Sequence, residues 1–271
     1  MKTFLIMAAA ATTLAFMAQG AHAYNQAPGT GLMGTAHDFA SHTGNRIPNT
    51  ASRDIGLCEY CHTMHVGRTT ELIWNHTLSK TNFAWDVAST TAGTKFPTIS
   101  GPTYKGPTAK CMSCHDGSVA VGDVAWFADG GRGGPAVLST WRMGDTDGNG
   151  KNTAQFVVGA GGSMAGNHPV AMPYSYGQVS NSYNGQAGGP GLVRADWQPN
   201  PGGLSSSRIQ LFNDDGTGAI GRGAVPGRTG IECSSCHDPH NKETMDKWFL
   251  RAKATGTTAA DGYICLQCHV M

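Results

Sequence analysis

The segment Cys233–His269 decides the fold of this chain. Its two ends read Cys233-Ser-Ser-Cys236-His237-Asp-Pro-His240 and Cys265-Leu-Gln-Cys268-His269. Each end contains a Cys-x-x-Cys-His unit, which is the sequence to which a c-type haem is attached. The spacing has a physical reason, because one tight turn brings both thiols to one edge of the porphyrin and places the next residue beneath the iron. This stretch therefore predicts two neighbouring haem sites.

The same unit occurs twice more, and the four copies account for all eight cysteines. The copies are Cys58/Cys61/His62, Cys111/Cys114/His115, Cys233/Cys236/His237 and Cys265/Cys268/His269. Disulfides, a zinc ribbon or a thioredoxin-like redox pair would not require a histidine after every cysteine pair. We therefore predict four covalently bound haem c groups, in which the histidine of each unit is the proximal iron ligand.

The N-terminal residues 1–23 predict a cleaved secretory signal. Lys2 precedes an apolar run, and the segment ends in Ala21-His22-Ala23, a typical cleavage site. The alternative is a membrane anchor, but the run is shorter than the roughly 20 apolar residues of a spanning helix. With 14% charged residues and a net charge of +1, the chain lacks the basic excess of nucleic-acid-binding proteins. We expect a secreted, extracellular chain that does not span a membrane; the periplasm is the alternative location.

The spacing of the motifs predicts one tetrahaem domain, residues 24–271, in three parts. Residues 24–115 and 233–271 each hold a haem pair, and residues 116–232 form a haem-free insert with 26 of the 38 glycines. The weak periodicity favours a mostly irregular fold with a few short helices and minimal strand, built around a stack of four haems. For the insert we favour an ordered, turn-rich wrap with a short hairpin over a disordered linker, because it contains aromatic anchors such as Trp197 and Tyr174.

Two further segments have a recognisable pattern. Residues 241–254 have the composition of a short helix, or of a turn that returns the chain to the last haem. The stretch Asp145-Thr-Asp147-Gly-Asn149-Gly150 matches the beginning of an EF-hand calcium loop. Phe156 stands where that loop requires a bidentate glutamate, so a plain turn is favoured over a calcium site.

Six histidines outside the motifs and the signal are candidates for the second ligand of each iron. They are His37, His42, His65, His76, His168 and His240. Six candidates for four positions predict that every haem is bis-histidine, with low reduction potentials and no open iron. The chain is then an electron carrier and not an enzyme.

Spacing suggests which haem each candidate reaches. His240 follows His237 by three residues, and His65 follows His62 by three. Such residues share one side of a helical turn, so they cannot approach one iron from opposite faces. We expect His240 on the haem of the fourth motif, His65 on that of the second and His168 on that of the third. The first haem is left to His37, His42 or His76.

Several phrases together resemble one family. They are Gly34-Thr-Ala-His37-Asp-Phe, Cys58-Glu-Tyr-Cys61-His62-Thr-Met-His65, Leu72-Ile-Trp74-Asn75-His76, Asn167-His168-Pro-Val and the closing doubled motif. In these the chain resembles the extracellular tetrahaem cytochromes of the filament-forming, OmcE-type nanowire family. The resemblance covers the chain thinly, through motifs, and Met64 stands where such proteins often have proline.

The resemblance implies a loop-dominated fold, a continuous stack of haems, and subunits joined end to end. It also implies that one subunit supplies an axial histidine to a neighbouring subunit, for which His37 or His42 is available. We expect electron transfer, with self-association into an extracellular filament and with other redox proteins or extracellular acceptors as partners. The alternatives are a monomeric periplasmic shuttle and a multihaem reductase with one open haem.

Overall fold

The computed structural model describes most of the chain after the predicted signal. The described residues are 27–39, 57–64, 67, 73–90, 93–101, 103–129, 132–146, 150, 152–187, 196–201 and 208–270. The predicted signal, the candidate ligands His42 and His65, and residues 147–149 of the possible calcium loop lie outside them.

The described residues contain two α-helices and ten short strands, together with four 3-10 helices. In chain order the elements are β1 Asn82–Phe83, β2 Ile99–Ser100, α2 Pro107–His115, β3 Asp123–Asp129, β4 Arg132–Val137, η2 Ala154–Phe156, η3 Ala160–Gly162, β5 Met172–Pro173, η4 Tyr176–Gln178, β6 Ser182–Tyr183, β7 Gln186–Ala187, β8 Phe212–Asp214, β9 Ile220–Arg222, β10 Thr229–Ile231, α3 Cys233–Cys236 and η7 Cys265–Gln267.

The expectation of an irregular fold with minimal strand was wrong. The strands form four antiparallel sheets, of which the largest has the order β5-β10-β8-β9. Most of these strands have two or three residues. That is too short for the four to eight residues, roughly, over which alternation identifies a strand. Residues 241–254, which have helical composition, form a series of turns instead.

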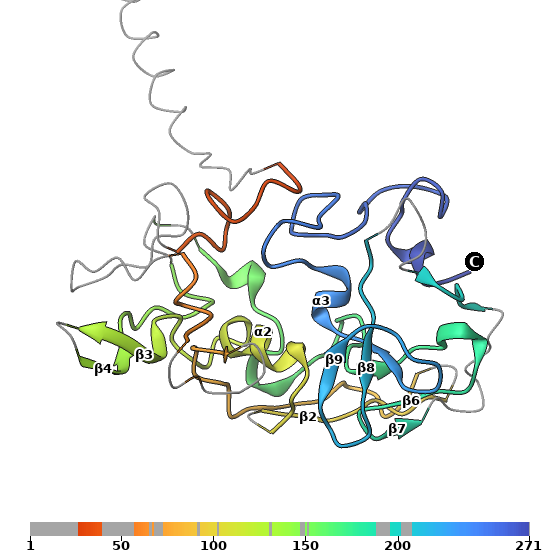
Figure 1. The fold of residues 1–271 in the computed structure, drawn as a ribbon, viewed down its shortest axis with the longest axis horizontal. Helices are drawn as coiled ribbons and strands as arrows, with labels where there is room; N and C mark the ends of the chain where they lie inside the picture. The colour runs from red at the N-terminus through yellow and green to blue at the C-terminus, as the bar shows by residue number, and fades with distance from the viewer. Residues whose placement is uncertain are drawn as a thin grey trace, which may run out of the picture.

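The insert contains the longest hairpin, formed by β3 and β4. It projects at the end of the molecule opposite to the C-terminus (Figure 1). Its register shifts between Val124 and Phe127, which marks a bulge. Val124 is fully buried, so the base of the hairpin contributes to the core.

Two apolar clusters make up the core of the described residues. The first consists of Phe39, Tyr60, Val121, Val124, Phe127, Leu138 and Trp141, with Cys61 and Cys114 packed against it. The second consists of Phe83, Ile99, Tyr104, Ala109, Met112, Met164 and Ala171. Residues from distant parts of the sequence meet in both clusters. One cysteine of each of the first two motifs, Cys61 and Cys114, therefore lies against a common core.

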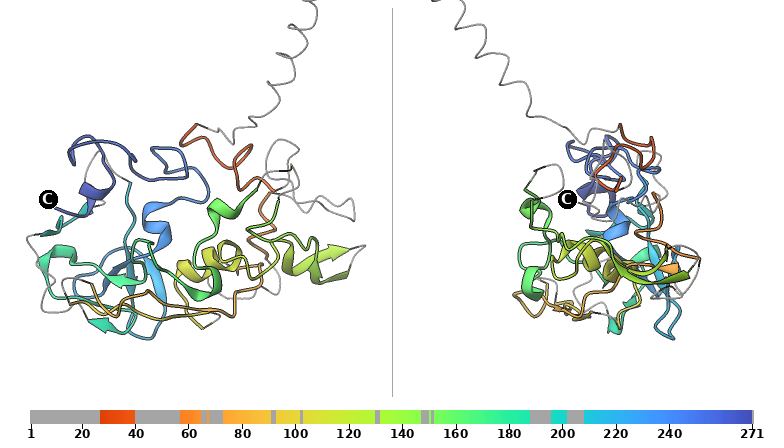
Figure 2. Two further views of the ribbon diagram at one scale, coloured as in Figure 1. Left: turned by 180° about the vertical axis from the view of Figure 1, so that it is seen from behind. Right: turned by 90° about the vertical axis from the view of Figure 1, so that its left-hand side faces the viewer.

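Helices α2 and α3 lie next to each other near the middle of the molecule (Figures 1 and 2). Helix α2 begins with Pro107 in its first turn, where the missing N–H of proline costs nothing. It ends at His115, so its last turn contains the whole second motif. Helix α3 consists of the third motif up to Cys236. In the described part of the chain, no helix is long and apolar enough to cross a membrane.

Candidate haem-binding sites

Each Cys-x-x-Cys-His unit forms one helical turn. In the first, third and fourth units the amide N–H of the histidine donates to the carbonyl oxygen of the first cysteine, at 2.8, 3.0 and 3.0 Å. The second unit lies within helix α2. A single turn therefore places both thiols and the imidazole of each unit close together, as the spacing predicts.

Five of the eight thiols have a raised pKa, unlike the cysteines of a reactive redox pair. All eight cysteines are free. Burial raises the pKa of Cys114 to about 12, and burial raises the pKa of Cys268 above its usual range. Reactive cysteines of Cys-x-x-Cys redox motifs have lowered pKa values, which these thiols lack. Cys233 is an exception, because a hydrogen bond with Cys111 lowers its pKa.

Three motif histidines face a histidine from elsewhere in the chain. The ring centres of His37 and His115 are 6.2 Å apart. Those of His62 and His240 are 6.1 Å apart, and those of His168 and His269 are 6.4 Å apart. These three pairs are called the ring pairs below.

The separation fits two imidazoles on opposite sides of one metal ion. With metal–nitrogen bonds of about 2.0 Å and each ring centre roughly 1.1 Å behind its nitrogen, the two centres fall about 6.2 Å apart. Ordinary aromatic pairs also lie about 4.5–7 Å apart, so the distance needs a second observation to support it. The hydrogen bonds of the other ring nitrogen provide that observation.

Four of the candidate ligands have Nδ1 held by a backbone carbonyl oxygen. His115 contacts the carbonyl of Phe156 at 2.9 Å, His37 that of Pro239 at 3.2 Å, His168 that of Pro169 at 2.9 Å and His237 that of Trp248 at 2.9 Å. A carbonyl oxygen only accepts, so Nδ1 carries the proton and Nε2 keeps its lone pair. Metal-binding histidines are oriented in this way.

Burial favours the neutral imidazole, the form that binds a metal, at His37, His115, His237 and His269. It lowers the pKa of His37 to about 4, and His115 adds to the shift. Burial also lowers the pKa of His115, His237 and His269. At neutral pH the lone pair on each of these rings is therefore available to iron.

His240 is oriented by a carboxylate instead. Asp238 is buried, and its Oδ1 lies 3.7 Å from Nδ1 of His240. Burial raises the pKa of Asp238, but hydrogen bonds from His240 and from the amides of Glu243 and Lys242 outweigh it and lower the pKa well below its usual range. In the sequence, Asp238 could have been identified by its position between the third motif and His240.

Trp248 and Phe249 support the ligands of two different motifs. The carbonyl of Trp248 holds His237, and the ring of Phe249 stacks on that of His37 at 4.6 Å and 17°. Both residues have a left-handed backbone, with φ of 63° and 58°. Such conformations are costly for large side chains and persist where the surroundings impose them. The sequence offered a turn here as the alternative to a helix, but nothing in its composition marks a positive φ at these two residues.

Tyr174 and Trp197, which the sequence suggested as anchors of the insert, lie at the fourth motif. The hydroxyl of Tyr174 donates to the carbonyl of Gln198 at 2.6 Å and to that of Cys268 at 3.2 Å. Trp197 packs edge-on against Tyr174 and lies 4.7 Å from the ring of His269. The insert therefore covers the last motif.

The ring pairs differ from the expected assignments. His240 faces the histidine of the first motif and not that of the fourth. His168 faces the histidine of the fourth motif and not that of the third. His37, expected among the candidates for the first haem, faces the histidine of the second. The i, i+3 argument excluded His237 as the partner of His240, but it gave no means of choosing among the other motifs.

His76 lies apart from the ring pairs within the described residues. It is buried, with Nδ1 2.9 Å from the carbonyl of Thr77 and Nε2 3.0 Å from that of Ala120. Both nitrogens therefore face backbone oxygens, and neither has a histidine opposite. In this structure His76 supports the fold next to Cys114, whose sulfur is 3.5 Å from Nε2.

The four cysteine pairs follow one another in sequence order. Burial raises the pKa of Cys61 to about 12, and the nearby Cys114 adds to the shift. The thiols of Cys111 and Cys233 are hydrogen-bonded to each other. Burial raises the pKa of Cys236 to about 11, with Cys233 and then Cys265 contributing. Thiols of consecutive motifs therefore lie close enough to affect one another's pKa, and those of Cys111 and Cys233 share a hydrogen bond.

A search of the described residues finds no group of three or more histidine, cysteine or acidic side chains that could hold a metal ion. A haem iron needs two protein ligands, since the porphyrin supplies the other four, so the ring pairs are sufficient for it. The residues of the motifs and ring pairs thus fit haem, whereas a zinc site with four protein ligands is not formed among them.

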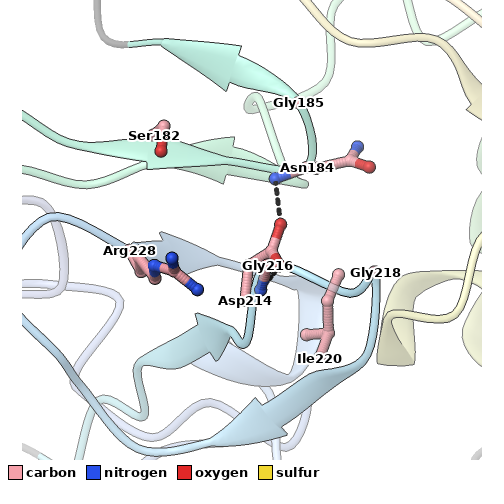
Figure 3. A pocket seen from close by; sticks show the side chains of 8 residues that line it. All are labelled: Ser182, Asn184, Gly185, Asp214, Gly216, Gly218, Ile220 and Arg228. Carbon is pink, nitrogen blue, oxygen red and sulfur yellow. Dashed lines mark hydrogen bonds between the residues drawn. The ribbon is translucent and has the colours of Figure 1, made fainter.

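A cavity of about 360 Å³ lies away from the motifs, between the β6–β7 and β8–β9 hairpins (Figure 3). It is lined by Ser182, Asn184, Gly185, Asp214, Gly216, Gly218, Ile220 and Arg228. The backbone N–H of Asn184 donates to Asp214 at 3.1 Å across it. The lining contains no cysteine or histidine.

A scan against protein-family models gives no match to this chain. A search of curated proteins likewise finds none that matches.

Proposed function

We propose that this chain is a secreted tetrahaem c-type cytochrome that transfers electrons. The single observation that supports this most is the set of three ring pairs, each of which joins a motif histidine to a distant histidine at the separation expected for a shared metal ion. When bound, each haem supplies a one-electron exchange at its iron. The chain supplies the attachment points, the axial ligands and their orientation.

The chain would hold the haems through residues named in the motifs. The eight cysteines form the thioether bonds, and His62, His115, His237 and His269 are the proximal ligands. His240, His37 and His168 are the distal ligands of the first, second and fourth sites. With two histidines from this chain at each of these three sites, the bound haem would exchange electrons there and leave no position for a substrate.

The sequence order of the thiol contacts supports a linear relay. The electrostatic influence of one motif's thiols on the next follows the order of the motifs, from the first to the fourth. Cys58 and Cys265, in the first and last motifs, are exposed, whereas the other six cysteines are partly buried. The two ends of the relay are thus the parts most accessible to another molecule, which supports electron entry at one end and exit at the other.

The distal ligand of the third haem site would distinguish a filament from a monomeric shuttle. In the described part of the chain, the ring of His237 has the carbonyl of Trp248 as its contact and no histidine facing it. Its distal ligand is to be sought in His42 or His65, which lie outside the described residues, or in a second copy of this chain. The last case supports end-to-end filaments. A monomeric shuttle requires the ligand to come from the same chain.

A reductase with one open haem is the second candidate, and the same observation favours it. If no histidine reaches the third iron, that iron is open to a small molecule. Carbon monoxide binding distinguishes the reductase from the electron carrier, because the gas binds quickly to an open ferrous haem and does not bind quickly to a bis-histidine haem.

The test is to produce the chain with a c-type haem maturation system and to measure its intact mass, visible spectrum and carbon monoxide binding. We expect four haems per chain, a spectrum of low-spin bis-histidine haem and no rapid carbon monoxide binding. Fewer than four haems, or high-spin haem in most sites, would refute the proposal. Electron microscopy of the same material distinguishes filament from shuttle.

A further inference from the structure

Glu232 is a buried carboxylate directly before the third motif, and it has an unusual number of donors. One oxygen accepts from the hydroxyls of Tyr104 and Tyr183, the latter at 2.7 Å. The other accepts from the hydroxyl of Thr108 and, at 3.1 Å, from its backbone N–H. The side chain of Glu232 also accepts from the N–H of Ser235, as half of a capping box.

These contacts join two helices that carry different motifs. Ser235 lies in α3, with the third motif, and Thr108 lies in the first turn of α2, which ends in the second motif. One side chain therefore caps the first turns of both helices. Capping carboxylates are favoured there because the first N–H groups of a helix have no partner within it.

The connection is reciprocal. The hydroxyl of Thr108 accepts from the backbone N–H of Cys233 at 3.2 Å, while it donates to Glu232. Each helix thus provides a cap for the other. The thiols of Cys111 and Cys233, which are hydrogen-bonded to each other, lie at the same junction.

We propose that Glu232 is the positioning residue of the electron step between the second and third haem sites. This rests on the proposed function. By holding the first turns of α2 and α3 together, Glu232 and Thr108 fix the separation and orientation of the two attachment sites at the joint between the two halves of the relay. A local helix cap would affect α3 alone. A long-range clamp would also affect α2, because Thr108 in that helix lies 124 residues before Glu232 in the sequence.

The experiment compares Glu232→Ala and Thr108→Val in the haem-loaded protein. The control is Thr229→Val, because Thr229 is equally buried and its hydroxyl donates to the carbonyl of Val225 at 2.7 Å, away from the junction. Hydrogen exchange is measured at the amides of Thr108 and Ser235. The reduction potentials and the visible circular dichroism report on the coupling between neighbouring haems.

We expect Glu232→Ala to accelerate exchange about tenfold or more at the amide of Thr108, which loses its acceptor so that the end of α2 opens locally. The effect at Ser235 should be smaller, because its N–H also donates to the backbone carbonyl oxygen of residue 232 at 2.9 Å, which the substitution keeps. The circular dichroism signal of haem–haem coupling should decrease while the mass still shows four haems. Glu232→Gln should retain most of the protection, since its amide oxygen faces Thr108 and the tyrosine hydroxyls rotate to accept from its N–H₂.

Faster exchange at Ser235 alone would overturn the clamp and leave a local cap. Unchanged haem coupling in both Glu232→Ala and Thr108→Val would also overturn it. If Glu232→Ala does not fold, Thr108→Val carries the test, because it removes one hydroxyl and keeps the backbone in place. A wild-type chain without four haems refutes the proposed function instead, and the exchange measurement still tests the link between the helices.

Discussion

Replacing His168 with alanine should open one iron of the four and leave the rest closed. His168 is exposed, and its ring nitrogen contacts only the carbonyl of the next residue, Pro169. Removing an exposed side chain of this kind changes the free energy of unfolding by about 0.5 kcal/mol or less. The effect on the site is large, because His168 is the ring that faces His269 at 6.4 Å.

No described neighbour can replace it. The closest other ring is that of Trp197, 4.7 Å from His269, and indole nitrogen is a donor that does not bind metals. The expected result is one carbon monoxide bound per chain and loss of one quarter of the bis-histidine signal. Magnetic circular dichroism and carbon monoxide titration of the reduced protein measure both quantities.

His76→Ala is the matched control, because His76 was also a candidate ligand by sequence, for the first haem. Its removal leaves the carbonyl oxygen that accepts its single N–H without a donor and should cost about 1–3 kcal/mol of stability. The variant should bind no carbon monoxide. The reasoning from ring pairs is refuted if His168→Ala binds none, or if His76→Ala binds one.

Three further changes test the fold around the sites. Asn75→Ala removes a fully buried amide that donates to and accepts from the backbone of Trp126, at 3.1 and 2.9 Å, and chemical denaturation should show a loss of about 2–3 kcal/mol. Gly162→Ala should cost about 2–3 kcal/mol in the same assay, because φ is +90° there and a Cβ would lie 2.4 Å from a backbone oxygen of strand β1; a neutral result would contradict this backbone. Arg222 and then Arg251 lower the pKa of Glu243, so its stabilisation is present above pH 4.5 and is lost as the pH falls through the lower folded value. In Glu243→Gln the free energy of unfolding should therefore fall less steeply at acid pH than in the wild type, by less than about 1 kcal/mol in total. An unchanged pH dependence would show that these ion pairs contribute nothing.

The sequence predicted the arrangement of those residues of the candidate sites that lie within a single motif. Both thiols and the proximal histidine of a motif lie within five residues, so one helical turn arranges them whatever surrounds them. The bond from the amide of His237 to the carbonyl of Cys233 is an example, at 3.0 Å. Spacing is sufficient for such a turn because its geometry depends on the backbone alone.

The distal partners could not be assigned in the same way. His62 and His240 are brought together across most of the chain, and nothing in the neighbourhood of either residue names the other. Nearness in sequence favoured the motif that follows His240, but the ring of His240 lies 6.1 Å from that of His62 in the first motif. The role of Glu232 was hidden for the same reason, since its partner Thr108 belongs to a distant segment.

Strand content was underestimated because the strands are short and their residues are unusual for strands. β9 and β10 each contain glycine, and each has three residues. Gly230 lies so close to the ring of Tyr183 that a Cβ there would be 2.3 Å from it. Such a glycine is required by packing, although in the sequence it resembles one more loop residue.

The carbonyl oxygens that hold the imidazoles have a consequence for how this sequence can change. At positions 156, 169, 239 and 248 the contact is made by the main chain. Substituting the side chains at these positions should leave the orientation of the ligands unchanged. Changing the number of residues between a carbonyl and its histidine should disturb it. Insertions or deletions there should therefore be far less tolerated than substitutions, and a library that varies length and identity independently would show it.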